Sequence, residues 1–150
     1  MHYHHILLIF HLLASTIWIG GHLLLATSYL PKALRQNNKV IIMDFESRYE
    51  RLGMSSLFVL VVTGIAMAID FGVYPGRWFH FAEPIERVIS VKLLLLFITL
   101  LLALSARFFV IPKLKLETGS IKVLAIHIIS VTFIGVLMLV LGSSIRFGGL

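Results

Sequence analysis

Four long apolar blocks dominate the chain, and the short segments between them collect the charged and turn-forming residues. The blocks cover residues 6–29, 53–70, 88–111 and 121–142. Each approaches or exceeds the roughly 20 residues that a helix needs to cross a bilayer. The pattern therefore predicts an all-α fold, a four-helix antiparallel transmembrane bundle forming one domain over residues 1–150. We see no internal repeat in the residue pattern.

Composition supports a membrane protein. Hydrophobic residues make up 59% of the chain and charged residues only 13%, whereas soluble domains carry about 25% charged residues. The chain has no cysteine, which excludes disulfides, cysteine-ligated zinc and iron–sulfur clusters. We expect a multi-pass protein of the bacterial inner membrane, with membrane lipid as its first partner.

The basic residues predict the orientation of the bundle. Nine flank the connections after the first and third blocks, and four lie toward the other side. Short loops rich in lysine and arginine stay cytoplasmic, so both termini are expected on the outer, periplasmic side. The formal net charge of +6 is thus a topology signal, and we expect no nucleic-acid binding. The nine are Lys32, Arg35, Lys39, Arg48, Arg51, Arg107, Lys113, Lys115 and Lys122; the four are Arg77, Arg87, Lys92 and Arg146.

A polar stripe runs along the first block. Its members, at spacings of seven, four, three and four residues, share one helix face; they are His4, His11, Ser15, Trp18 and His22. Lipid offers no hydrogen-bond partner, so such a stripe faces the bundle interior. Gly20 and Gly21 beside it permit close approach of a neighbouring helix or a flat ligand.

The fourth block carries polar positions at matching depths. His127 lies about as far from the inner surface as His22 does, on an antiparallel helix. Met138, eleven residues beyond His127 on the same face, lies at the level of His11. The two helices therefore offer two stacked positions, an inner one with two imidazoles and an outer one with imidazole and thioether.

Haem b is the cofactor that such pairs favour, because its iron takes two axial ligands and both His/His and His/Met pairs serve electron transfer. We predict His22 and His127 as ligands of one haem, in a pocket shaped by Trp18 and Gly21. His11 with Met138 would hold a second haem. The alternative is that each histidine hydrogen-bonds across a helix interface, and that Met138 is packing.

Further histidines are predicted on the outer side. His2, His4, His5 and His80 lie there with nearby carboxylates, and imidazole with carboxylate suits copper(II) or zinc. The alternative is a solvated terminus in which histidine has no role, and His11 can belong to this site instead of a haem. Lys92 in the third block either snorkels to the surface or neutralises a haem propionate or an anionic substrate.

Three stretches resemble a known family. They are "HLLASTIWIGGHLLL", "FESRYERLGMSSLFVLVVTGIAMAI" and "ISVKLLLLF", and they resemble the membrane domain of CopD-like copper-resistance proteins over most of residues 5–100, less so in the fourth block. His11, Trp18, Gly21 and the Val91–Lys92 pair also look like HemJ-type protoporphyrinogen oxidases. The chain departs from HemJ in having His22 and in lacking a histidine after Lys92.

The resemblance implies a small haem-b-binding bundle, with copper handling at its outer face on the CopD side. We expect a b-type cytochrome that passes single electrons between a membrane or periplasmic donor and an outer haem or copper site. Candidate partners are quinol or quinone, superoxide, oxygen and copper ion, and a homodimer would bury the cofactor better than one chain. The alternatives are a HemJ-like oxidase with Lys92 as catalytic residue, and a copper carrier without redox chemistry.

Overall fold

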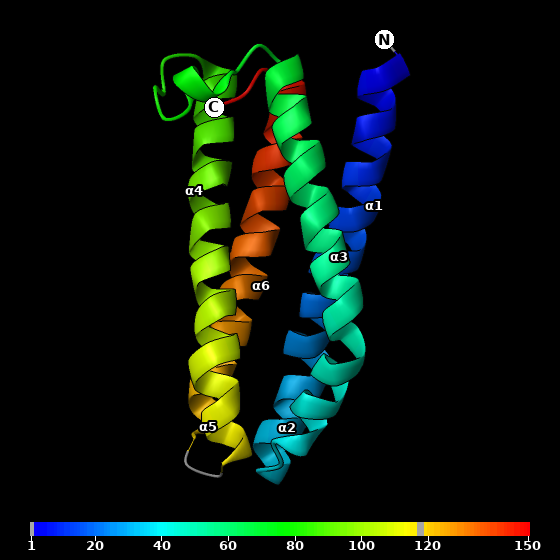
Figure 1. Ribbon diagram of the computed structural model, residues 1–150, viewed down its shortest axis with the longest axis vertical. Helices are drawn as coiled ribbons and strands as arrows, with labels where there is room; N and C mark the ends of the chain where they lie inside the picture. The colour runs from blue at the N-terminus through cyan, green and yellow to red at the C-terminus, as the bar shows by residue number, and fades with distance from the viewer. Residues whose placement is uncertain (1, 117–118) are drawn as a thin grey trace.

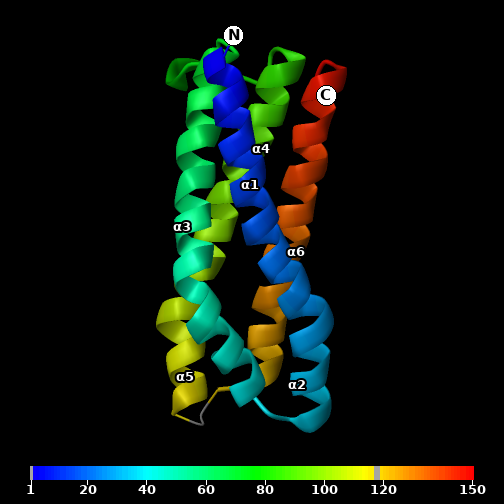
Figure 2. The same cartoon turned by 90° about the vertical axis from the view of Figure 1, so that its right-hand side faces the viewer.

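The computed structural model describes residues 2–116 and 119–150. Within that part the chain folds into long helices that run side by side as one elongated bundle, with both chain ends at the same end (Figures 1 and 2). The predicted all-α bundle of four membrane-length helices is confirmed. The side of the membrane that holds the two termini stays a prediction.

We call the four membrane-length helical segments rods, and two of them are interrupted by a π-helical segment. The first consists of α1 (His2–Leu24), the π-helical segment η1 (Leu25–Tyr29) and α2 (Leu30–Gln36). The third consists of α4 (Pro84–Ser105), the π-helical segment η3 (Ala106–Val110) and α5 (Ile111–Lys115). The second and fourth are α3 (Val40–Asp70) and α6 (Ile121–Ser144), and the 3-10 turns η2 (Pro75–Arg77) and η4 (Ile145–Phe147) complete the described elements.

Proline explains the interruptions. Pro31 and Pro112 each stand at the start of the short helix that follows a π segment. A proline inside a helix lacks the N–H that the carbonyl four residues earlier would accept, and its ring crowds that carbonyl. The wider π turn just before each proline accommodates this defect without ending the rod. The rods therefore bend, rather than stop, near the end of the bundle that carries α2 and α5 (Figure 1).

Most of the apolar surface faces outward. The four candidate spans have mean hydropathy between 1.8 and 2.6. Only 17% to 28% of the 18-residue apolar stretch in each span is buried inside the protein. Large side chains such as Phe58, Phe133 and Ile126 are more than half exposed. In water such a surface would aggregate, whereas lipid solvates it at no cost. The charged segment before residue 53 is continuous with the second span in α3.

The connection between α3 and α4, residues 71–83, is tied to the start of α4. Glu83 and Glu86 form a capping box there, and Arg77 Nε lies 2.5 Å from the buried Glu86 carboxylate. Arg87 donates to the carbonyl of Leu150 at 3.4 Å, which holds the C-terminus against the same helix end. Phe79 and Phe81 both have positive φ, at 66° and 56°, a conformation that bulky residues rarely adopt. The flanking contacts keep this loop in place.

Candidate ligand-binding cavity

A cavity of about 630 Å³ lies among the four rods, in the half of the bundle that carries α2 and α5. Residues of α1, η1, α3, α4, η3, α5 and α6 line it, and both His22 and His127 are among them. Met54, Glu50 and Arg107, on α3 and η3, are among its exposed lining residues. The cavity is therefore partly open on the side where α3 faces the third rod.

His22 on α1 is held by its own helix. Its Nδ1 lies 2.8 Å from the carbonyl oxygen of Trp18, and the two rings pack with centroids 4.6 Å apart. A carbonyl only accepts, so Nδ1 carries the proton and donates. In the neutral imidazole, Nε2 then has a free lone pair. This is the tautomer that a metal ligand needs, with the second nitrogen fixed by a backbone carbonyl.

His127 on α6 repeats this arrangement. Its Nδ1 donates to the carbonyl of Val123, one turn earlier, at 2.9 Å. Its Nε2 therefore accepts, and the partner is the hydroxyl of Ser105 on α4 at 3.2 Å. The structure thus places two imidazoles from the first and last rods at one cavity, each with its Nε2 set to accept. Whether they ligate a metal together stays a prediction.

Tyr49 on α3 packs against α1 beside His22. Its hydroxyl donates to the carbonyl of Ile17 at 2.7 Å and lies 3.2 Å from that of Trp18. Its ring lies against Gly21, and a Cβ added to Gly21 would collide with it. Gly21 is therefore needed for close helix approach, as expected, but the neighbour is an aromatic ring of α3. The sequence analysis did not identify Tyr49. The signal available was Gly21 itself, because a glycine beside the predicted ligand His22 leaves room for a bulky side chain of a neighbouring helix.

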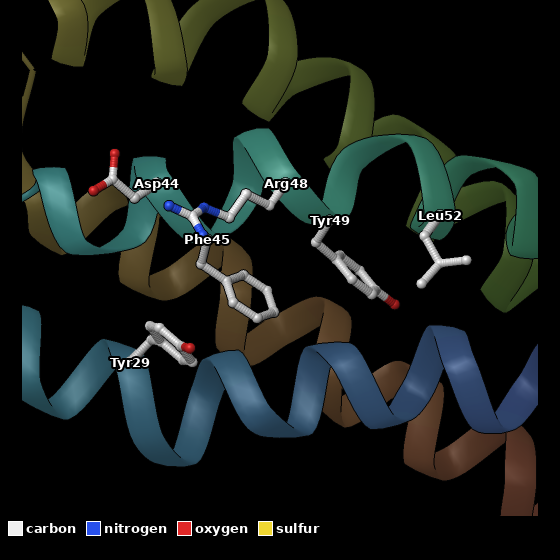
Figure 3. Close-up of a pocket in the computed structure, with 6 residues that line it drawn as sticks. All are labelled: Tyr29, Asp44, Phe45, Arg48, Tyr49 and Leu52. Atoms are coloured by element: carbon white, nitrogen blue, oxygen red, sulfur yellow. The ribbon is translucent and has the colours of Figure 1, made fainter.

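An aromatic stack extends from Tyr49 toward η1. Phe45 stacks on Tyr49 with ring centroids 5.3 Å apart, and Tyr29 packs on Phe45 at 4.6 Å. Figure 3 shows these rings in the space between α3 and the first rod. They line a second, shallower pocket of about 380 Å³, together with Asp44, Arg48 and Leu52. This pocket has no histidine in its lining, so the larger cavity is the better candidate for a cofactor.

Charged groups gather at the open side of the larger cavity. Glu50 on α3 forms an ion pair with Arg107 on η3, which bridges the two rods. Glu46 and Lys115 line the cavity near this pair. Deeper inside, Thr99 is 1% exposed, and its hydroxyl oxygen is buried without a hydrogen-bond partner among the described residues. Buried hydroxyls are normally paired, so Thr99 marks a place where a ligand atom or water is expected.

His11 lies apart from this cavity, toward the end of the bundle that carries the chain termini. Its Nδ1 lies 2.8 Å from Thr63 Oγ1, and Thr63 donates its own proton to the carbonyl of Val59. His11 therefore donates to Thr63, and its ring lies against Gly64 of α3. Met138, expected at the same level, packs with Trp18 in an apolar cluster. The proposed second ligand pair stays a prediction.

Lys92 reaches the interior between α4 and α6. A Cβ added to Gly142 would lie 3.2 Å from Lys92 Nζ. None of the described residues gives Lys92 a hydrogen bond or an ion pair. An ammonium in a bundle without a partner is costly, which makes Lys92 a candidate for contact with an anionic ligand.

The outer histidines do not form a metal site among the described residues. His4 pairs with Asp70 and packs edge-on against Phe71. His5 and His80 are exposed, and the side chain of His2 lies outside the described part. No three histidine or acidic side chains of the described residues stand close enough to hold a metal ion. The predicted outer copper site gains no support from this geometry.

Comparison with known protein families gives a match to this chain. The model of the CopD family, described as copper resistance protein D, matches residues 43–145. No curated protein and no solved structure matches the chain. The match covers more than half of the chain and includes α6 with His127, where the resemblance was expected to be weakest. It leaves out α1, which carries His11 and His22.

Proposed function

The chain belongs to the CopD family of copper resistance proteins, and we propose that it is a haem-b-binding membrane protein that transfers single electrons. One observation carries the proposal: imidazoles from α1 and α6 line the same cavity, each with Nδ1 bound to its own backbone. His22 and His127 are the axial ligands in this proposal. Bound haem iron would take up and release one electron at a time.

The residues around the cavity fit such a group. The Trp18 ring and the Leu57 and Val131 side chains provide apolar walls. Arg107 and Lys115 provide cations at the open side, where carboxylate substituents of a macrocycle would need them. Glu50 already pairs with Arg107, so Lys115 is the better partner for such a group.

The chain's own contribution is orientation. The carbonyls of Trp18 and Val123 fix the tautomer and direction of the two rings, and Tyr49 holds the α1 backbone that carries the first carbonyl. A preset ligand loses little conformational entropy on binding, which strengthens the site. Donor and acceptor are proposed as quinol, superoxide, oxygen or copper ion, met from the membrane or its outer side.

An optical spectrum with a metal count tests this function. Protein purified in detergent should show a Soret band, a narrow α-band after dithionite reduction, and iron in stoichiometric amount. His22→Ala and His127→Ala should each abolish the low-spin spectrum, whereas His80→Ala, at an exposed outer position, should leave it unchanged. Purified protein without iron and without a Soret band would refute the proposal.

A second candidate function is copper transport without redox chemistry. Met43 and Met54 line the same cavity as the two histidines, and thioether with imidazole suits copper(I). In this case copper is the cargo, and the match to a copper resistance family supports it. Copper bound without iron, and lost in a Met43→Leu/Met54→Leu variant, would favour this function over the first.

A further inference from the structure

The two halves of the chain share one architecture at a constant offset. The π segment η3 begins at Ala106, 81 residues after η1 begins at Leu25. The long helix α6 begins at Ile121, also 81 residues after α3 begins at Val40. At the same offset the Pro-Lys pair that follows η1 recurs after η3, at positions 31–32 and 112–113. Each half therefore runs long helix, π segment, short proline-led helix and long helix.

The same 81-residue offset relates pairs of residues that line the cavity. Seven cavity-lining residues lie on α1, η1 and α6, and each of them has a counterpart 81 residues away that lines the same cavity. Fourteen lining residues thus form seven pairs, whereas twelve others, on α3 and the third rod, have no counterpart on the wall, so the cavity extends farther on that side. The pairs that matter most here are Trp18 with Thr99, His22 with Ala103, and Glu46 with His127.

The direction of the halves fixes their relation. α1 and α4 start at the same end of the bundle, and α2 and α5 lie together at the other (Figures 1 and 2). Two tandem units that run in the same direction are related by an axis along the membrane normal, as in parallel-repeat transporters, whose binding sites lie at the repeat interface. The cavity occupies this interface.

We propose that the cavity is a pseudo-two-fold site between two tandem repeats, in which Ala103 and Glu46 occupy a second pair of ligand positions. The inference rests on the proposed ligand role of His22 and His127, whose counterparts these two residues are. In the present sequence Ala103 offers no ligating side chain, and Glu46 carries a carboxylate. The class of ligand is the same, a planar metal-containing cofactor that imidazoles can hold.

The two sides of the cavity differ in how closely their helices pack, which fits the presence of imidazoles in only one of the two pairs. On the first side α1 packs on α6. Thr132 donates to the carbonyl of Ile128 at 2.7 Å, its hydroxyl oxygen lies 3.3 Å from the carbonyl oxygen of His22, and Gly135 leaves room for the Trp18 ring. On the equivalent side α3 does not pack closely on α4, and the Glu50–Arg107 ion pair bridges α3 to η3. Histidines on the open side would lie farther from rigid support than those on the closed side.

Transplanting the ligands tests the proposal. His22→Ala/His127→Ala should lose haem, and adding Ala103→His/Glu46→His to that variant should restore a low-spin spectrum. The matched control adds Ala106→His/Ser47→His instead, because these positions also line the cavity but are not counterparts of the ligands. A folded four-site variant that stays haem-free, or equal recovery in the control, would overturn the proposal.

A second measurement leaves His22 and His127 in place. The chain has no cysteine, so Ala103→Cys and Glu46→Cys each introduce one thiol. Each should react with a water-soluble maleimide in haem-free protein and be protected at least tenfold after haemin is added. An unprotected thiol at both positions in haem-loaded protein overturns the second ligand pair. If the wild-type chain binds no haem, it is the proposed function that fails. In that case the thiols alone test the cavity: if neither Ala103→Cys nor Glu46→Cys reacts with maleimide, the two positions do not share an accessible cavity and this inference is overturned.

Discussion

Gly20 and Gly21 are adjacent in α1 but meet different surroundings, and substituting each by alanine separates packing from helix propensity. A Cβ at Gly20 has nothing within 4 Å, whereas a Cβ at Gly21 would collide with the ring of Tyr49. The Tyr49 ring is held by its hydroxyl, which donates to the carbonyl of Ile17 at 2.7 Å. It therefore cannot move aside without losing that hydrogen bond.

The magnitudes follow from these contacts. Alanine in place of glycine inside a helix stabilises by about 1 kcal/mol, and Gly20→Ala should show this gain in full. Gly21→Ala should gain the same amount but lose about 1 kcal/mol for the hydrogen bond and about 2 kcal/mol for overpacking. The net effect is a loss of about 2 kcal/mol, which places the two variants about 3 kcal/mol apart.

Thermal unfolding in detergent, followed by circular dichroism, measures the difference. For a chain of this size about 3 kcal/mol corresponds to a separation of roughly 10 °C in Tm. In a Tyr49→Ala background the collision is absent, so Gly21→Ala should then match Gly20→Ala. Equal Tm values for the two single variants in the wild-type background would refute the argument that Tyr49 fills the space at Gly21.

Further predictions concern the cavity and Lys92. Ser105→Ala should tighten haem binding about fivefold, since His127 no longer gives up a hydrogen bond worth about 1 kcal/mol to reach iron; haemin titration that gives unchanged or weaker affinity contradicts this. Glu46→Gln should raise the haem midpoint potential, because a carboxylate near the iron favours the ferric state, and spectroelectrochemistry checks the sign. Lys92→Met should leave the low-spin spectrum intact. Loss of porphyrinogen oxidation in the Lys92→Met variant, measured by fluorescence, would favour the HemJ-like alternative.

Hydropathy alone predicts the bundle because burial in lipid requires long apolar helices whatever their neighbours. The inward face of α1 was also predictable, since polar side chains at helical spacing have no partner in lipid. Counting residues from the ends of the apolar blocks also gives His22 and His127 similar depths, and both line the same cavity. These rules work because each depends on spacing along a single helix.

Other features depend on contacts between helices and are not visible in one sequence. Tyr49 lies against Gly21 because of the way α1 meets α3, and His11 finds Thr63 for the same reason. The duplication is equally hidden: the halves share little beyond the Pro-Lys pairs, because lipid accepts any apolar side chain at most positions. It becomes visible through the π segments and the cavity wall, whose spacing is preserved although the residues differ.

The unequal sides of the cavity have a consequence for the order of assembly. A flat cofactor cannot pass between α1 and α6 without breaking the Thr132 contact and the fit of Trp18 at Gly135. It can pass sideways between α3 and α4 once Glu50 and Arg107 separate. For the proposed haem, this geometry predicts that the apoprotein inserts and folds first and that the cofactor, dissolved in the bilayer, enters afterwards by lateral diffusion.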